Sequence, residues 1–182
     1  MYSFINRLST KKNLIAGLLL IVIINLVVFP FFPALLDGSD IDFSNIFDLQ
    51  FGFNTAYVIQ TLTNLGQKGR HIYMLSTIFV DIPYLIIYGF VYAILINTVL
   101  HKLQFDFKLL IYLSFLISLF DLIENIGVIY FLQTYPDISL QMVKLTSIAN
   151  QLKWLTVFVL FCCFIILLII LMYKSYSKSS KK

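Results

Sequence analysis

The stretch that decides the fold is STIFVDIPYLIIYGF, from Ser76 to Phe90. Most of its residues are apolar enough for the lipid interior, yet Asp81 lies inside it and Pro83 follows closely. An ionised side chain at the centre of a membrane helix costs about 2.5–3.5 kcal/mol on insertion scales, so such residues normally face protein or water. The stretch therefore predicts a membrane helix that belongs to a bundle and has one polar side.

The composition of the whole chain also indicates a membrane protein. Of its 182 residues, 60% are hydrophobic and 12% are charged, and the mean hydropathy is +0.91. Soluble domains have about 25% charged residues, so the soluble globular class is excluded. The net charge of +4 comes from basic residues at the chain ends and in one short loop. This pattern indicates membrane topology and not nucleic-acid binding.

Four segments are long enough and apolar enough to cross a bilayer, which takes roughly 20 residues. They are residues 14–33, 72–99, 109–132 and 154–173. The first has a longer apolar run than a signal peptide and no small-residue cleavage site, so we expect a retained anchor. The fold class is therefore all-α: a single domain over residues 1–182, an integral membrane bundle of four transmembrane helices, with a basic cytoplasmic tail at 174–182.

Basic residues in the short flanks set the orientation of a multi-pass protein. They gather before the first span, between the second and third, and after the fourth, at Arg7, Lys11, Lys12, Lys102, Lys108, Lys174, Lys178, Lys181 and Lys182. The opposite loops hold acidic residues, namely Asp37, Asp40, Asp42, Asp48 and Asp137. Lys68, Arg70 and Lys144 are exceptions at the edges of spans. We expect a plasma-membrane protein with both termini in the cytoplasm.

The first outer loop contains a stretch, NTAYVIQTLTNLG, that predicts a short amphipathic helix on the membrane surface. Its apolar positions are Ala56, Ile59, Leu62 and either Val58 or Leu65. Asn54 or Thr55 would cap the start of this helix, and Gly66 would end it in a left-handed turn. The alternative is an ordinary covering loop.

Polar residues form one stripe on each of two predicted spans. The stripe of the second span is Asp81, Tyr84, Tyr88 and Tyr92, and that of the third span is Asp121, Glu124 and Asn125. Residues three or four apart share one face of a helix. Because intramembrane charges avoid lipid, we expect the two stripes to face each other or a shared cavity.

The first predicted span also places a polar residue at the depth of the two stripes. At about 1.5 Å per residue, Asp81, Asp121, Glu124 and Asn25 of the first span all lie roughly 12–17 Å below the outer ends of their spans. Lys153 enters near that side. Its side chain either reaches inward to these groups or extends outward to the lipid headgroups.

Candidate roles follow from the residue types. Carboxyl groups that share a low-dielectric site can act as an acid/base pair or bind a cation, so Asp81, Asp121 and Glu124 are the candidate catalytic residues. Ligand contacts are assigned to Asn25, Arg70, Tyr84, Tyr88 and Asn125. Arg70 at the outer rim would hold an anionic headgroup, or would simply be positive charge at a helix edge.

No metal site or cofactor is expected. His71 and His101 fall at opposite ends of the second span, and no phosphate-binding loop, zinc motif or serine elbow is present in the sequence. Cys162 and Cys163 are adjacent, so their side chains point apart on a helix and predict no disulfide.

Three kinds of function remain compatible with these features. The leading one is a pocket that binds or acts on a lipid-like or small amphipathic molecule, whether or not the protein is an enzyme. The second is a proton- or cation-coupled small transporter, for which four helices are few, so a homodimer would be needed. The third is a non-catalytic membrane assembly subunit whose polar groups clamp helices together. Membrane lipid is the expected partner in each case.

Three motifs between Leu62 and Asn125 resemble a pattern in small, uncharacterised bacterial four-pass membrane proteins. The motifs are LTNLGQKGRHIY, VDIPYLIIYG and DLIEN, which resemble L-G-x-x-G-R-x-x-Y, an intramembrane Asp, and D-x-x-E-N. The resemblance implies the four-pass fold, brings no activity, and singles out Gly66, Gly69, Arg70, Tyr73, Asp81, Asp121, Glu124 and Asn125. In size and buried acids the chain is also similar to the EXPERA group, which includes emopamil-binding sterol isomerases, but that group's motifs are not reproduced.

Overall fold

The computed structural model describes residues 2–36 and 46–179, with the side chains described as far as residue 177. The described residues form helices and no strands, which confirms the all-α fold. In this part of the chain, four segments are long and apolar enough to cross a membrane. They are Lys11–Leu35, Thr55–Leu103, Leu109–Thr134 and Leu140–Ser177. Asp37, Asp40 and Asp42 of the predicted outer loop, and Lys181 and Lys182 of the tail, lie outside the described residues.

The first two spans are each interrupted by a π-helical turn. The first consists of α2 (Lys11–Ile23), η1 (Ile24–Val28) and α3 (Phe29–Leu35). The second consists of α4 (Thr55–Ser76), η3 (Thr77–Asp81) and α5 (Ile82–Leu103). Each π turn lies just before a proline, Pro30 or Pro83, whose ring would clash with a carbonyl of the preceding α-helical turn. The wider turn accommodates that ring, and it carries Asn25 in one span and Asp81 in the other.

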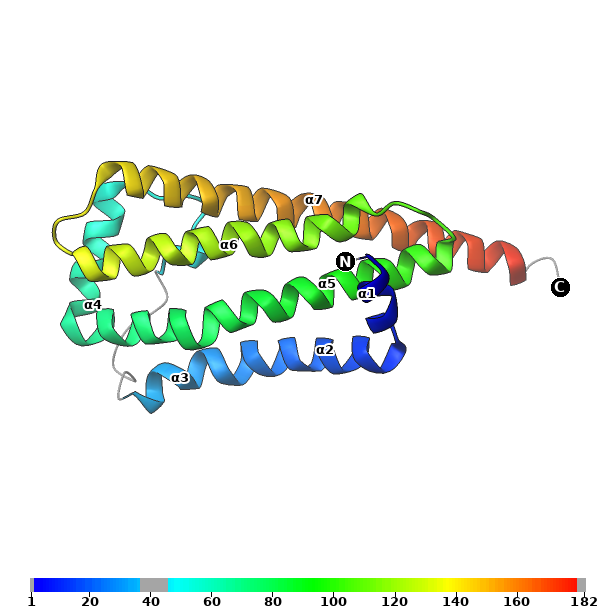
Figure 1. Ribbon diagram of the computed structural model, residues 1–182, viewed down its shortest axis with the longest axis horizontal. Coiled ribbons are helices and arrows are strands. Elements are labelled where there is room, and N and C mark those ends of the chain that lie inside the picture. Colours follow the sequence, from blue (N-terminus) through cyan, green and yellow to red (C-terminus); the bar gives the residue numbers. More distant parts are fainter. Residues whose placement is uncertain (1, 37–45, 180–182) are drawn as a thin grey trace.

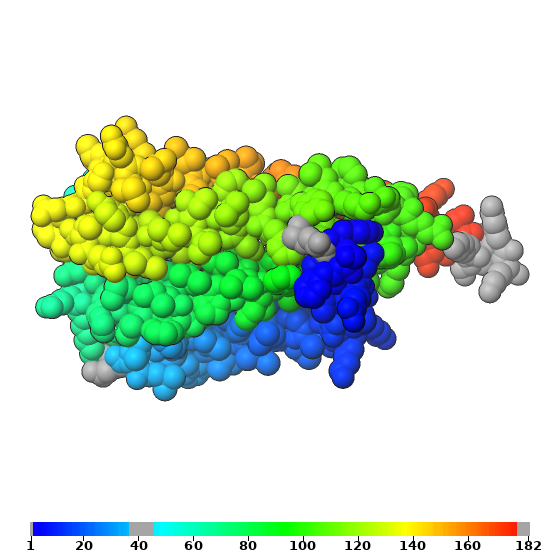
Figure 2. Space-filling view, in the orientation of Figure 1, coloured from blue at the N-terminus to red at the C-terminus, as the bar shows by residue number. Residues whose placement is uncertain are grey.

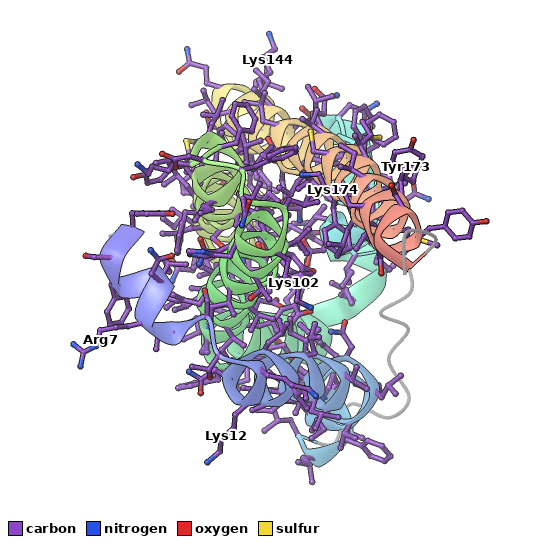
Figure 3. The ribbon with its side chains drawn as sticks, turned by 90° about the vertical axis from the view of Figure 1, so that its right-hand side faces the viewer. Arg7, Lys12, Lys102, Lys144, Tyr173 and Lys174 are labelled. Atoms are coloured by element: carbon purple, nitrogen blue, oxygen red, sulfur yellow. The ribbon has the colours of Figure 1, made fainter. Side chains whose placement is uncertain are left out.

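The spans pack in chain order. Helix α2 contacts α5, α5 contacts α6 (Leu109–Thr134), and α6 contacts α7 (Leu140–Ser179), which also reaches α5. Seen along the bundle, the helices follow an arc with α2 at one end and α7 at the other (Figure 3). Helix α7 begins well before the predicted fourth span. Two polar residues of its early turns, Ser147 and Asn150, accept hydrogen bonds from the backbone of a neighbouring segment.

Small residues allow close contact between neighbouring helices. A Cβ added to Gly89 of α5 would overlap the side chain of Ser118 on α6, and one added to Gly127 of α6 would overlap Thr146 on α7. The Ser118 hydroxyl donates a hydrogen bond of 2.8 Å to the backbone oxygen of Leu85 across the same contact. Close backbone approach at small residues is the usual way in which membrane helices associate without a hydrophobic driving force.

The first half of α4 is the short helix predicted for the first outer loop. Asn54 caps it, because its side chain accepts a hydrogen bond from the backbone N–H of Tyr57. The buried side chains on this half are Val58, Thr61, Leu62 and Leu65. Ala56 and Ile59 of the predicted apolar stripe are exposed on this half, whereas Leu62 and the alternative Val58 pack against the end of the bundle.

Gly66 separates the two halves of α4. Its φ of 63° and ψ of −178° lie outside the helical region, in a conformation that glycine adopts without the cost of a Cβ. The chain then resumes a helix and continues into the membrane. The Leu62 carbonyl before the break accepts a hydrogen bond of 2.8 Å from Nη1 of Arg70 after it. The break turns the first half of α4 across the end of the bundle, which we call the α4 end (Figure 1).

The opposite end of the bundle, the terminal end, carries α1 (Tyr2–Leu8) and the last turns of α7 (Figure 1). Helix α1 lies across α5, as the space-filling view shows (Figure 2), and Asn97 of α5 donates a hydrogen bond of 2.8 Å to Asn6. Arg7 and Lys12 point away from the bundle at this end (Figure 3). The terminal end is therefore the basic end of the described chain.

Candidate functional site

A cavity of about 510 Å³ lies between the spans towards the α4 end. Residues from the described parts of all the spans and from the segment 46–49 line it, namely Asn25, Phe29, Pro33, Ile46, Asp48, Leu49, Tyr73, Ser76, Asp81, Tyr84, Tyr88, Tyr92, Ile117, Asp121, Lys153, Trp154 and Val157. Most of this lining is aromatic or aliphatic, with a few charged groups. That combination is typical of small-molecule sites in proteins.

The ammonium group of Lys153 lies against the carboxylates of Asp48, Asp121 and Glu124. Its Nζ forms an ion pair with Asp48, lies 3.2 Å from Oδ1 of Asp121, and lies 2.7 Å from Oε2 of Glu124. The Glu124 contact is an ion pair whose angles do not meet hydrogen-bond geometry. The side chain of Lys153 is only 8% exposed. It therefore points inward to the carboxylates and does not extend outward to the headgroups.

Asn150, one helical turn before Lys153, joins the buried cluster to the loop that covers it. Its Nδ2 donates a hydrogen bond of 2.9 Å to Oε1 of Glu124, and its Oδ1 accepts one of 2.7 Å from the backbone N–H of Gly52. Ser147, a further turn back, accepts a hydrogen bond of 2.9 Å from the N–H of Phe53. One face of α7 thus holds the segment 47–53 over the cavity.

The two predicted polar stripes are in direct contact. The Tyr88 hydroxyl donates a hydrogen bond of 2.7 Å to Oδ2 of Asp121, which joins α5 to α6. The first span reaches the same stripe, because Nδ2 of Asn25 donates a hydrogen bond of 2.6 Å to the hydroxyl of Tyr84. These bonds fix the tyrosines on the cavity wall.

Asp81 differs from the other carboxylates of the cavity. Asp81 is the last residue of η3 and is half-buried. It lies within electrostatic range of Asp48, Asp121 and Lys153. Among the described residues, no hydrogen bond or ion pair engages its carboxylate. A half-buried carboxylate beside other acids, with no partner of its own, is available to a ligand.

The structure separates the sequence-predicted residues into two groups. Those that line the cavity are Asn25, Asp81, Tyr84, Tyr88 and Asp121. Glu124 is buried behind them and contacts Lys153 and Asn150. Asn125 is buried with an Nδ2 that lacks a hydrogen-bond partner among the described residues. Arg70 lies over the ring of Tyr135, with its Cζ 4.4 Å from the ring centroid, and is not part of the cavity wall.

Sequence reasoning missed Asp48 and Asn150. In the sequence Asp48 is one of the outer-loop acids that indicate topology, and no helical spacing connects it to the spans. Asn150 could have been found, because Ser147, Asn150 and Lys153 follow one another at three-residue intervals and share a helix face.

The carboxylates of Asp48, Asp121 and Glu124 also satisfy a distance test for a metal site. One oxygen of each lies within 4.8 Å of the others. Lys153 already brings a positive charge to all of them, so a metal ion at this position would compete with the chain's own ammonium group. The geometry is that of an internal ion-pair cluster.

Comparison with known proteins found no match to this chain among protein-family models, curated proteins or solved structures. The resemblance to small bacterial four-pass proteins therefore stays a prediction. Function has to be argued from the site.

Proposed function

We propose that this chain is a multi-pass plasma-membrane protein whose cavity binds a small amphipathic or lipid-like molecule. One observation carries the proposal. Residues of every described span bound the cavity, and along the helices its charged groups are followed, about one turn further on, by apolar groups. Its volume of about 510 Å³ lies within the range of small-molecule sites, which runs from about 300 to 1,000 Å³.

The polar and apolar levels follow from positions along the helices. Asp121 and Lys153 stand on one level of the cavity wall. Ile117 and Val157 lie one helical turn from them, on the side away from the α4 end, and Tyr92 lies one turn beyond Tyr88 in the same direction. A ligand with a polar head and an apolar body fits this order, with its head under the segment 46–49.

The bilayer is the proposed source of the ligand. Phe29 and Pro33 of the first span and Trp154 and Val157 of the last line the same cavity, although α2 and α7 lie at opposite ends of the helix arc (Figure 3). A ligand that moves between these helices enters from the lipid without crossing the loop that covers the α4 end.

Each cavity residue has a role in this proposal. Asp81 and Asp121 face the polar head and do any acid/base or cation-binding work, and Glu124 acts through Lys153 without touching the ligand. Asn25, Tyr84 and Tyr88 orient the head by hydrogen bonds. Arg70 and Asn125 are left out of the ligand contacts, because neither lines the cavity.

The proposal is tested by purification in a mild neutral detergent followed by native mass spectrometry and extraction of bound small molecules. We expect a defined molecule in a fixed ratio to the protein, and its loss from Asp81→Leu. Asp137→Asn is the control, since Asp137 is an exposed acid outside the cavity. A preparation that carries only bulk phospholipid, equally in all variants, would contradict the proposal.

A second function is favoured by the buried ionisable cluster around Lys153. Intramembrane acids paired with a basic group are a feature of proton relays in transporters. A proton- or cation-coupled transporter predicts that reconstituted vesicles dissipate a pH gradient, and that Asp121→Asn abolishes this flux. This function also predicts a homodimer in detergent, which mass photometry measures.

The orientation of the chain is part of the proposal. The basic residues of the described chain at the terminal end indicate that this end faces the cytoplasm. A reporter fused after Lys182 should then report the cytoplasm, and one inserted near Asp48 should report the opposite side. A C-terminus on the far side would reverse the topology.

A further inference from the structure

We infer that the ligand of the cavity is a lipophilic organic cation, an amine or quaternary ammonium with an apolar body. This inference rests on the proposed function and names its ligand class. It is carried by the aromatic lining of the cavity, by the carboxylate of Asp81, which has no partner among the described residues, and by the ion pairs that already engage the ammonium of Lys153.

The charges at the cavity do not balance. Lys153 is one ammonium group, and it already contacts Asp48, Asp121 and Glu124. Asp81 adds a further carboxylate on the cavity wall, with no ion pair to any described residue. Because an uncompensated charge away from water is costly, a ligand cation beside Asp81 would be held by this excess of negative charge.

The aromatic side chains of the wall suit a cation as well. Phe29, Tyr84, Tyr88 and Tyr92 form a continuous row, with centroid separations of 5.3 Å, 5.3 Å and 5.4 Å between successive rings. Tyr84 lies about one helical turn from Asp81 on the same span, and Trp154 lines the cavity from α7. Ring faces attract ammonium groups, and sites that recognise quaternary ammonium ligands combine several rings in this way.

An anionic head would find the ammonium and the amide donor of the cavity already engaged. The Tyr88 hydroxyl donates to Asp121, and Nδ2 of Asn25 donates to Tyr84 and to the backbone oxygen of Ile21. The ammonium of Lys153 is shared among carboxylates. An anion could therefore pair with this ammonium only by displacing carboxylates from it.

One more polar group is available at the cavity. The hydroxyl oxygen of Ser76 is buried on the cavity wall without a hydrogen-bond partner among the described residues. A hydroxyl can accept a hydrogen bond from an ammonium N–H as readily as it can donate one. Ser76 and Asp81 line the cavity from the same span, so an amine head that reached both would pair with each of them.

The chain contains its own reporter for this test. Trp154 is the single tryptophan of the sequence, and it lines the cavity. Pyridinium ions quench indole fluorescence on contact, so N-octylpyridinium serves as a cationic probe with an apolar body. The protein is titrated in dodecyl maltoside below the micelle concentration of the probe. The competitors are octyltrimethylammonium and octyl sulfate, which share a tail length and differ in the sign of the head charge.

We expect saturable quenching of Trp154 that octyltrimethylammonium reverses and octyl sulfate does not. Asp81→Asn should weaken the apparent affinity by about tenfold or more, because it removes the unpaired charge and keeps the size of the side chain. Asp81→Glu should keep most of the affinity, and Asp137→Asn should match the unchanged chain. The comparison between the two competitors needs no variant, so it holds even if a variant folds poorly.

Two results would overturn the inference. One is quenching without saturation, and the other is equal displacement by the two competitors. If either occurs while the purified protein carries a neutral or anionic lipid that Asp81→Leu removes, the ligand class is wrong and the proposed function stands. If no molecule co-purifies and no probe binds, both proposals fail.

Discussion

Nζ of Lys153 lies 2.7 Å from Oε2 of Glu124, and the glutamate residue is only 1% exposed. These residues come from different spans, α7 and α6, so their ion pair lies within the bundle. Asn150 supplies a hydrogen bond to the other oxygen of Glu124. A buried pair with additional hydrogen bonds can offset its own desolvation, whereas either charge alone cannot.

Removal of the Lys153 charge should therefore destabilise the bundle. We expect Lys153→Met to lower the free energy of unfolding by about 3–5 kcal/mol, since it leaves Glu124 and Asp121 as uncompensated buried acids. Thermal unfolding in detergent, followed by circular dichroism, measures the effect. Lys144→Met on the exposed face of α7 is the matched control. Addition of Glu124→Gln to Lys153→Met should recover part of the loss, and no recovery would argue against the pair.

Tyr88 and Tyr92 offer a matched comparison within the cavity. The Tyr88 hydroxyl donates to the Asp121 carboxylate, whereas the Tyr92 hydroxyl has no hydrogen bond to another described residue. A hydrogen bond to a charged group contributes about 1.5–3 kcal/mol, so Tyr88→Phe should lower stability by that order and Tyr92→Phe by much less. Denaturant unfolding of the two variants in the same detergent measures the difference. Equal losses would show that ring packing, and not the bond to Asp121, stabilises this wall.

Asn150 should control the order of the loop over the cavity. Asn150→Ala removes the acceptor for the Gly52 N–H and a donor to Glu124, and each buried group left unpaired costs about 1–3 kcal/mol. We expect faster amide hydrogen exchange across residues 47–53, measured by mass spectrometry. Gln141→Ala, on an exposed position of the same helix, should leave this exchange unchanged. Unchanged exchange in Asn150→Ala would mean that Ser147 and the aromatic contacts hold the loop by themselves.

Gly127 should tolerate no side chain at the contact between α6 and α7. A Cβ at this position would overlap the side chain of Thr146, and overpacking of this kind costs about 1–3 kcal/mol. Gly127→Ala should lower the unfolding temperature accordingly. Adding Thr146→Ala should restore part of it, because the nearest overlapping atoms are those beyond the Cβ of Thr146. A Gly127→Ala variant as stable as the unchanged chain would mean that the helices separate without cost.

The helices and the meeting of the polar stripes could be predicted from the sequence. A lipid-exposed helix is identified by composition alone, and α6 begins at the predicted Leu109. Helical spacing placed Asp121 with Glu124, and Asp81 with Tyr84 and Tyr88, because three- and four-residue separations fix a shared face. Because buried charges in membrane helices need protein partners, the two stripes were expected to face each other.

The partners of Lys153 could not be predicted in the same way. Its side chain is long enough to extend to the headgroups or into the bundle, and the choice depends on acids that other segments supply. Asp48 lies in a loop, where no periodicity fixes the direction of a side chain. The break in α4 could be predicted only in part. Gly66 predicted the turn, but the hydrogen bond from Arg70 across it depends on where the second half of the helix resumes.

Arg70 provides the last test, because the structure gives it a role other than the headgroup contact expected from its position at the rim. Its Nη1 donates to the Leu62 carbonyl across the Gly66 break, and its guanidinium lies over the ring of Tyr135. Arg70→Met should leave that carbonyl without its side-chain donor and remove the stacked cation, which together cost about 1–3 kcal/mol. Binding of N-octylpyridinium should be unchanged where the variant is folded. Arg70→Lys keeps the charge but not the planar stacking, so the stability of this variant should lie between that of the unchanged chain and that of Arg70→Met. If Arg70→Met instead kept full stability and lost binding, the arginine would be a ligand contact after all.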